Sequence, residues 1–281
     1  MVRIITDSAA DFEPWELEKM NIICIPLVVM FGETEYQENV NLSKTRFYEL
    51  LAASEDLPKT SQASPQVLVD LLEDAKKAGD EAIYITLSSA PSGTYQSALM
   101  AKALVGGDGC YIVDSLNGTG GQRMVVEQAV KLRDAGMDAA GIVAQLETLR
   151  CRIVLYACMD TLENLYRGGR ISHTVYTLGS LANIKPIIRV ELDGRVAVPA
   201  KAMGMRKGMD YLYKQAQKHP VDEAFPFYVM YTDNRENGKV LAEHFRKMGM
   251  DIPDAHIIQV GAAIGTHIGH NAVGFVCVEK A

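Results

Sequence analysis

Short apolar runs alternate with amphipathic stretches through the first half of the chain. The apolar runs predict strands at residues 2–6, 22–30, 82–87 and 110–114. Apolar residues at helical spacing predict helices near 43–53, 64–78, 93–105, 119–136 and 138–150. Short buried strands that alternate with helices form a parallel sheet with both faces covered. We therefore expect an N-terminal α/β domain over residues 1–150, with a parallel sheet flanked by helices.

The predicted helix at 64–78 has the clearest boundaries. Ser64 stands at the N-cap position, Pro65 suits the first turn, and Gly79 ends the pattern. The face that we expect to be buried consists of Val67, Leu68, Leu71, Leu72 and Ala75.

The second half of the chain has a different pattern, in which strand-like runs follow one another more closely. We predict strands within 152–160, 184–198, 227–232, 256–260 and 272–279, and helices near 174–182, 203–218 and 235–249. Asp193-Gly194 inside one run is a strong hairpin signal. We expect a second α/β domain over residues 151–281, with a mixed or antiparallel sheet.

The charge of the chain argues against nucleic acid as a partner. It holds 28 basic and 35 acidic residues, a net charge of −7. Residues 1–150 carry 12 basic and 22 acidic residues (−10), whereas the remainder carries 16 and 13 (+3). The positive second half could therefore steer an acidic partner.

The cysteines and the apolar runs indicate a cellular compartment. The five cysteines are odd in number, lack C-x-x-C spacing, and stand mostly in apolar runs, which is typical of reduced thiols. No run reaches the roughly 18–20 apolar residues that a membrane span needs. We expect a cytoplasmic protein with at most transient membrane contact.

Polar loops adjoin several predicted strands, where parallel α/β sheets bind their ligands. Their hydroxyl and amide donors beside helix N-termini suit an anion. Capping explains Asp7, Ser8, Asp114 and Ser115 well. For Thr60, Ser61 and Ser92, the sequence favours neither helix capping nor ligand contact over the other. The segment 88–94 (SSAPSGT) holds more hydroxyls than one cap requires.

The sequence lacks the motifs of nucleotide and metal sites. Neither G-x-x-x-x-G-K-[ST] nor a post-strand G-x-G-x-x-G is present, and H-E-x-x-H is absent around His267 and His270. We expect no cofactor and no metal. A few neutral donors suit a carboxylate better than a triphosphate.

Two further segments carry cationic residues. In 167–170 (RGGR), the glycines allow close backbone approach while Arg167 and Arg170 could grip an anion; a solvated turn is the alternative. The run 201–207 (KAMGMRK) fits either an exposed helix start or the lip of an apolar tunnel. A Ser92–His267 pair would suit a hydrolase or acyltransferase, although G-x-S-x-G is missing.

Seven motifs run in order over nearly the whole chain: ITDSAAD at 5–11, PKTSQASP at 58–65, SSAPSGTYQSA at 88–98, VDSLNGTGGQ at 113–122, TLENLYRGGRIS at 161–172, LANIKPII at 181–188 and IGTHIG at 264–269. Together they resemble the DegV family of bacterial fatty-acid-binding proteins. The resemblance implies two α/β domains and a long-chain fatty acid in an apolar tunnel, to which residues 151–281 contribute. Some members present the carboxylate to a separate ATP-dependent fatty acid kinase that makes the acyl phosphate for phospholipid synthesis.

The resemblance also implies site residues. It places Thr60 or Ser61, Ser92 and His267 at the carboxylate. The full ligand-binding set that we predict is Thr60, Ser61, Ser92, Gly93, Thr94, Arg170 and His267, with no catalytic residue. Met203 and His270-Asn271 depart from the family pattern. We therefore expect a fatty acid carrier that serves a kinase, with a Ser/His hydrolase or acyltransferase as the alternative.

Overall fold

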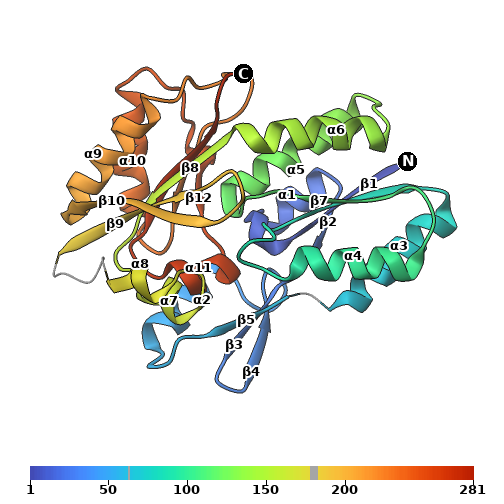
Figure 1. The fold of residues 1–281 in the computed structure, drawn as a ribbon, viewed down its shortest axis with the longest axis horizontal. Helices are drawn as coiled ribbons and strands as arrows, with labels where there is room; N and C mark the ends of the chain where they lie inside the picture. Colours follow the sequence, from blue (N-terminus) through green and yellow to red (C-terminus); the bar gives the residue numbers. More distant parts are fainter. Residues whose placement is uncertain (63, 178–182) are drawn as a thin grey trace.

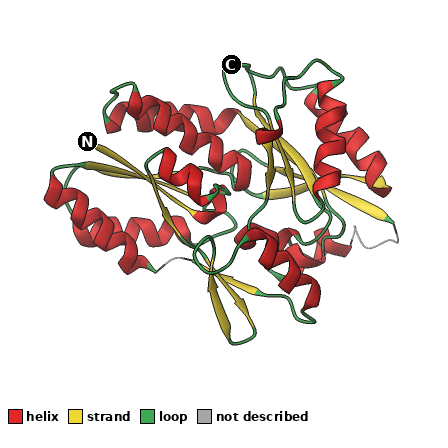
Figure 2. Cartoon of the chain, turned by 180° about the vertical axis from the view of Figure 1, so that it is seen from behind, coloured by secondary structure: helices red, strands yellow, loops and turns green. Residues whose placement is uncertain are grey.

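The computed structural model of the chain describes residues 1–62, 64–177 and 183–281. Within these ranges the strands form three sheets (Figure 1). A six-stranded sheet lies on the left of Figure 1, a four-stranded sheet on the right, and a three-stranded sheet below them. Figure 2 shows from behind that helices pack beside both larger sheets.

The four-stranded sheet is parallel, as the sequence predicts. Its order is β2-β1-β6-β7, with β1 (Val2–Asp7), β2 (Ile22–Ile25), β6 (Glu81–Thr86) and β7 (Cys110–Asp114). Side chains of neighbouring residues alternate between its faces. Ile5 and Tyr84 pack toward α3 (Pro65–Ala78) and α4 (Thr94–Val105). Ile4 and Ile83 pack toward α5 (Thr119–Asp134) and α6 (Ala139–Leu149), so both faces are covered.

Helix α3 follows its predicted boundaries closely. Gly79 ends it in the left-handed region with φ 70°, which glycine adopts without strain. Leu68, Leu72 and Ala75 are buried as expected. The prediction for Val67 is wrong, since this residue lies in the first turn of α3 and 42% of it is exposed.

The six-stranded sheet is mixed and has the order β10-β9-β8-β13-β11-β12. Its strands are β8 (Ile153–Cys158), β9 (Ile184–Val190), β10 (Val196–Met203), β11 (Tyr228–Tyr231), β12 (Ile257–Gln259) and β13 (Val273–Val278). Only β11 and β12 pair in parallel among them. β9 and β10 form the hairpin that Asp193-Gly194 predicts, and Gly194 has φ 79°. Helices α9 (Gly204–Ala216) and α10 (Arg235–Arg246) cover one face.

The three-stranded sheet is absent from the sequence prediction. It joins β3 (Val28–Phe31), β4 (Thr34–Gln37) and β5 (Lys59–Ser61) in the antiparallel order β4-β3-β5. The single strand predicted at 22–30 is therefore wrong. Pro26, which has no N–H for a strand ladder, separates β2 from β3 and lets the chain leave the parallel sheet.

One hydrophobic core joins the two larger sheets through α5 and α6. It includes Ile83 and Ile85 of the parallel sheet together with Leu155 and Val276 of the mixed sheet. At Gly120 a Cβ would lie 2.7 Å from Val276 Cγ1, so α5 packs very closely on the mixed sheet. The domain boundary near residue 150 falls between α6 and β8 and stays a prediction.

The remaining elements are short or connect the sheets. They are α1 (Pro14–Lys19), α2 (Lys44–Ala53), α7 (Glu163–Arg167), α8 (His173–Thr177), α11 (Ala262–Ile268) and the 3₁₀ turns η1 (Ser8–Ala10), η2 (Arg150–Arg152) and η3 (Asp254–His256). Of the helix predicted at 174–182, residues 178–182 lie outside the described residues. None of the helices in the described ranges combines the length and apolar character needed to cross a membrane.

Candidate functional site

A cavity of about 410 Å³ lies where the loops after β6 and β7 meet the mixed sheet and α11. Ligand pockets in proteins have volumes of roughly 300–1,000 Å³. The mixed sheet supplies an apolar wall through Leu155, Ile188, Val190 and Val196. Ile188 and Val190 are two residues apart on β9 and so share a face. This wall is absent from the ligand-binding residues predicted from the sequence, although apolar residues alternate within 184–198 in the way that a wall on one face of a strand requires.

Helix α11 brings a histidine to the cavity from the end of the chain. His267 lies in the last turn of this helix, and Gly269 ends it. Gly265 lies inside the helix. A Cβ at this position would lie 2.6 Å from Tyr48 Oη and 2.7 Å from Phe47 Cε1, which leaves no room for a side chain. Glycine at this position therefore reflects close packing on α2 rather than a turn. Figure 1 shows α11 in the middle of the molecule, beside α7.

The His267 side chain pairs with Thr60. His267 Nε2 and Thr60 Oγ1 are 2.9 Å apart, which joins α11 to β5. The other ring nitrogen, Nδ1, is buried and has no hydrogen-bond partner within the described residues. A Cβ on Gly168 would lie 2.3 Å from this nitrogen, so the backbone of the RGGR segment packs directly on the imidazole. Burial and then the charge of Arg170 lower the pKa of His267 to about 4, and the ring is neutral at pH 7.

Arg170 connects the RGGR segment with the loop before α4. Its Nε donates to Pro91 O at 3.1 Å and its Nη1 donates to Gly168 O at 2.5 Å. Burial lowers the pKa of the guanidinium. Across residues 1–62, 64–177 and 183–281, no carboxylate lies within 4 Å of it, although Arg170 lines the cavity. An uncompensated cation therefore stands at the cavity wall.

The loop before α4 places three predicted residues at the cavity. Ser92 Oγ lies 2.9 Å from Thr94 Oγ1 and accepts a hydrogen bond from Thr94 N. A Cβ on Gly93 would lie 2.6 Å from Gln62 Oε1, so this glycine admits the side chain of Gln62. Gln62 lines the cavity and is absent from our predicted set.

The structure brings all seven predicted residues together. Thr60, Ser61, Ser92, Gly93, Thr94, Arg170 and His267 line the same cavity. Contacts from β5 to α11, from α11 to the RGGR segment, from that segment to the loop at 91–94, and from Gly93 back to Gln62 directly after β5 join them into one ring. Thr60 rather than Ser61 pairs with the histidine. Within 167–170, Gly168 allows the close backbone approach that the sequence suggests, whereas a Cβ on Gly169 would meet no atom within 4 Å.

Two carboxylates that the sequence predicts as helix caps bind backbone N–H groups of the loop at 87–89 and of Leu116. Asp7 Oδ2 accepts from Leu87 N at 2.8 Å, and burial raises the pKa of Asp7 to about 6. Asp114 Oδ1 accepts from Ser89 N and Leu116 N at 3.2 and 2.9 Å. Both carboxylates therefore fix the loop that leads to Ser92.

The run 201–207 and the pair His270-Asn271 lie outside the residues that line the cavity. Residues 201–207 end β10 and begin α9, and none of them lines the cavity, so the tunnel-lip interpretation is wrong. His270 Nδ1 lies 2.8 Å from Asp233 Oδ2, and Asn271 N donates to the same side chain. These two departures from the family pattern therefore bind Asp233 rather than the cavity.

The hydrolase alternative finds no support in these contacts. Ser92 and His267 hydrogen-bond to different threonines, and in the described part of the chain no carboxylate orients the imidazole. The same ranges contain no group of three or more His, Cys, Asp or Glu side chains placed to hold a metal.

Comparison with known proteins gives a consistent assignment. Residues 1–280 match a family profile described as "Uncharacterised protein, DegV family". A DegV domain-containing protein of Caldanaerobacter subterraneus is 32% identical over 280 residues, 99% of each chain. A solved structure on fatty acid binding by a DegV family protein from Thermus thermophilus matches with a TM-score of 0.89 and 26% identity, covering 99% of each chain. DegV from Bacillus subtilis, a fatty acid binding protein, matches with a TM-score of 0.83, 28% identity and 99% coverage of each chain. Sequence and fold thus agree over the full chain, which belongs to the DegV family.

Proposed function

We propose that this chain binds one long-chain fatty acid in the cavity, with the carboxylate at Thr60, Ser92, Arg170 and His267 and with Ser61, Gly93 and Thr94 beside it. The observation that carries the proposal is an apolar cavity with one uncompensated cation and several hydroxyls gathered in one ring of contacts. The fatty acid binding of the relatives from Thermus thermophilus and Bacillus subtilis supports the ligand class.

The head-group chemistry follows from the neutral imidazole. When His267 donates its Nε2 proton to Thr60 Oγ1, the threonine hydroxyl is free to donate to a ligand oxygen. Ser92 can offer a second hydroxyl in the same way, and Arg170 supplies the positive charge. These donors suit a carboxylate, which accepts several hydrogen bonds at once.

The tail supplies most of the affinity. Burying roughly 14 methylenes of palmitate at about 0.8 kcal/mol each contributes about 11 kcal/mol before the costs of association. Each charge-assisted hydrogen bond at the head group contributes about 1.5–3 kcal/mol. The apolar wall therefore determines whether a lipid binds, and the polar ring determines which end lies where.

We further propose that the chain is a cytoplasmic carrier without catalysis of its own, with domains at 1–150 and 151–281, that presents the carboxylate to an ATP-dependent fatty acid kinase. All five cysteines are free, which fits a reducing compartment. A basic surface could dock an acidic partner; we define it by Arg167, Lys201, Arg206 and Lys207, for which the described residues offer no carboxylate within 4 Å. Lys185, Arg189 and Arg195, by contrast, pair with acidic neighbours.

Native mass spectrometry of the protein purified from cells tests the proposal. We expect one co-purified mass of fatty-acid size per chain, at lower occupancy when His267 and Arg170 are both replaced by alanine. A chain that carries no lipid and binds no added palmitate would contradict it. Ester hydrolysis by the isolated chain that disappears in Ser92→Ala would favour the hydrolase instead.

A further inference from the structure

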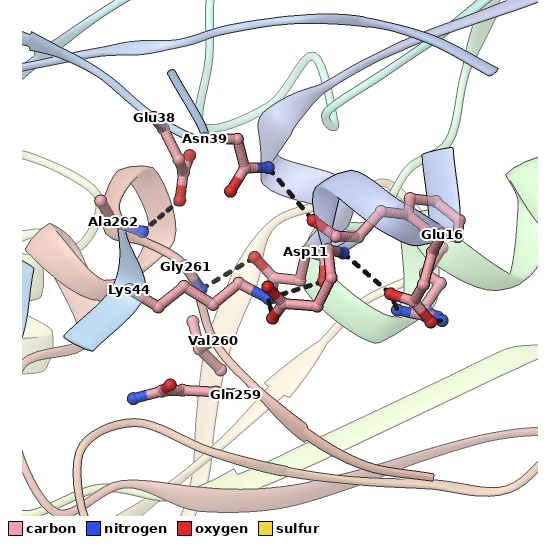
Figure 3. A network of polar contacts seen from close by, with 12 residues as sticks. Asp11, Glu16, Glu38, Asn39, Lys44, Gln259, Val260, Gly261 and Ala262 are labelled. Carbon is pink, nitrogen blue, oxygen red and sulfur yellow. Dashed lines mark hydrogen bonds and ion pairs between the residues drawn. The ribbon is translucent and has the colours of Figure 1, made fainter. Parts of the chain in front are cut away.

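Two buried carboxylates meet the first residues of α11 (Figure 3). Gly261 N donates to Asp11 Oδ1 at 2.8 Å, Ala262 N donates to Glu38 Oε1, and Ala263 N donates to Glu38 Oε2 at 3.4 Å. Each carboxylate residue is only 1% exposed. A Cβ on Gly261 would lie 2.1 Å from Glu38 Oε1 and 2.8 Å from Asp11 Oδ1. Since Gly261 has φ −79°, glycine here provides space for the carboxylates rather than an unusual backbone.

Hydrogen bonds within the first half of the chain hold the Glu38 carboxylate and the backbone of Asp11. Ser8 Oγ donates to Glu38 Oε2 at 2.7 Å and accepts from Leu27 N at 2.9 Å. The buried Lys44 donates from Nζ to Asp11 O and to Glu13 Oε1, both at 2.8 Å. The start of α11 is thus held near η1, β3 and α2 by two buried carboxylates.

Helix α11 carries this restraint to the cavity. About five residues separate Ala262 from His267, which corresponds to about 8 Å along a helix. Thr266 Oγ1 donates to Ala262 O at 2.9 Å, and Asn164 Nδ2 donates to Thr266 O at 3.0 Å. Neither Asp11 nor Glu38 lines the cavity, so any effect on a ligand passes through the helix.

We propose that Glu38 and Asp11 are positioning residues for ligand binding: they fix the start of α11 and thereby hold His267 at hydrogen-bond distance from Thr60. This inference rests on the proposed function, because the proposed function places the ligand's carboxylate at the far end of α11, where His267 lies.

The electrostatics agree with a role in position rather than stability. Burial, and then the charge of Asp11, raises the pKa of Glu38 to about 7. Burial also raises the pKa of Asp11 to about 6 despite the nearby Lys44. A carboxyl group whose pKa rises on folding destabilises the fold when ionised. Ionisation of the pair therefore lowers the stability of the fold as the pH rises through these pKa values, and the bonds to the start of α11 give the pair a role in holding that helix.

A double-mutant cycle on palmitate affinity tests the proposal. We expect Glu38→Ala and His267→Ala each to raise the Kd for palmitate about 10- to 100-fold, as loss of a charge-assisted hydrogen bond does. The double variant should be no more than about 3-fold weaker than His267→Ala alone, because both changes remove the same contact. Asp138→Ala, which removes the cap of α6 far from α11, is the matched control and should leave the Kd unchanged. Additive effects of Glu38→Ala and His267→Ala, or an unchanged Kd in Glu38→Ala, would overturn the proposal.

Conservative variants keep the test valid if Glu38→Ala does not fold. Glu38→Gln retains an oxygen acceptor for Ala262 N and should restore binding to within about 3-fold of wild type. Glu38→Asp withdraws the oxygen by one methylene and should shift the ¹⁵N resonances of His267 in the ligand-free protein. An unmoved His267 signal in Glu38→Asp would contradict the proposal. This readout needs no ligand, so a wild type that fails to bind palmitate would refute the proposed function and leave the positioning test intact.

Discussion

Thr60 and His267 are 207 positions apart in the chain, yet their side chains hydrogen-bond at 2.9 Å. The contact joins an edge strand of the three-stranded sheet to a short helix near the C-terminus. Both residues belong to motifs that predict a ligand site, but only the fold makes them neighbours. Their pairing defines the polar end of the proposed fatty acid site.

Ser92→Ala tests how the binding free energy is shared between the head group and the tail of the ligand. We expect palmitate binding to weaken by about 1–3 kcal/mol, because one hydroxyl is lost while the apolar wall remains. Kinase-dependent phosphorylation should fall further than affinity, because transfer requires an aligned carboxylate oxygen. Calorimetry and an acyl phosphate assay separate the two effects. Equal losses in binding and turnover would argue against a role of Ser92 in alignment.

Arg170 and Arg167 offer a matched comparison within one segment. Arg170→Gln removes the cation at the cavity and should raise the Kd for palmitate about 10- to 100-fold. Arg167 is exposed and does not line the cavity, so Arg167→Gln should leave the Kd unchanged. Titration with a fluorescent fatty acid measures the Kd of both variants. Similar affinities for the two variants would remove Arg170 from the site.

The pH dependence of stability reports on His267. Its pKa falls from 6.5 to about 4 on folding, so below pH 6.5 the unfolded chain takes up a proton that the folded chain does not. The free energy of unfolding of the wild type should therefore decrease, relative to His267→Gln, by up to about 3 kcal/mol as pH falls from 6.5 to 4. Urea denaturation across this range measures the difference. A constant difference would mean that the imidazole is not buried in its neutral form.

Charge reversal on the basic surface tests partner docking. Lys201→Glu combined with Lys207→Glu should leave palmitate affinity unchanged, because neither residue lines the cavity. Turnover by a kinase partner should fall and lose its dependence on ionic strength, as expected when electrostatic steering is removed. Lys239→Glu combined with Lys247→Glu, on and directly after α10, changes the charge by the same amount and serves as the control. Unchanged turnover in the double variant would place the docking surface elsewhere.

The sequence predicts the parallel sheet well, because it depends on local patterns; the ligand-binding set follows from motifs that resemble the DegV family, and its members line one cavity. Alternating apolar runs mark β1, β6 and β7, and Asp193-Gly194 marks the β9–β10 hairpin. The three-stranded sheet escapes prediction because β3 and β5 pair across about 30 residues, and Pro26 is the only local sign of a break. Helix α11 escapes it because its glycines reflect packing against Tyr48, Glu38 and Asp11, which local sequence does not reveal.

Binding of palmitate labelled with ¹³C at its carboxyl carbon tests the central claim most directly. We predict one bound resonance per chain whose carboxyl stays ionised well below its usual pKa, because Arg170 and the hydroxyl donors favour the charged form. The resonance should shift in His267→Gln and in Arg170→Gln. No saturable bound signal, or a bound carboxyl that titrates as in water and is indifferent to both substitutions, would contradict the account.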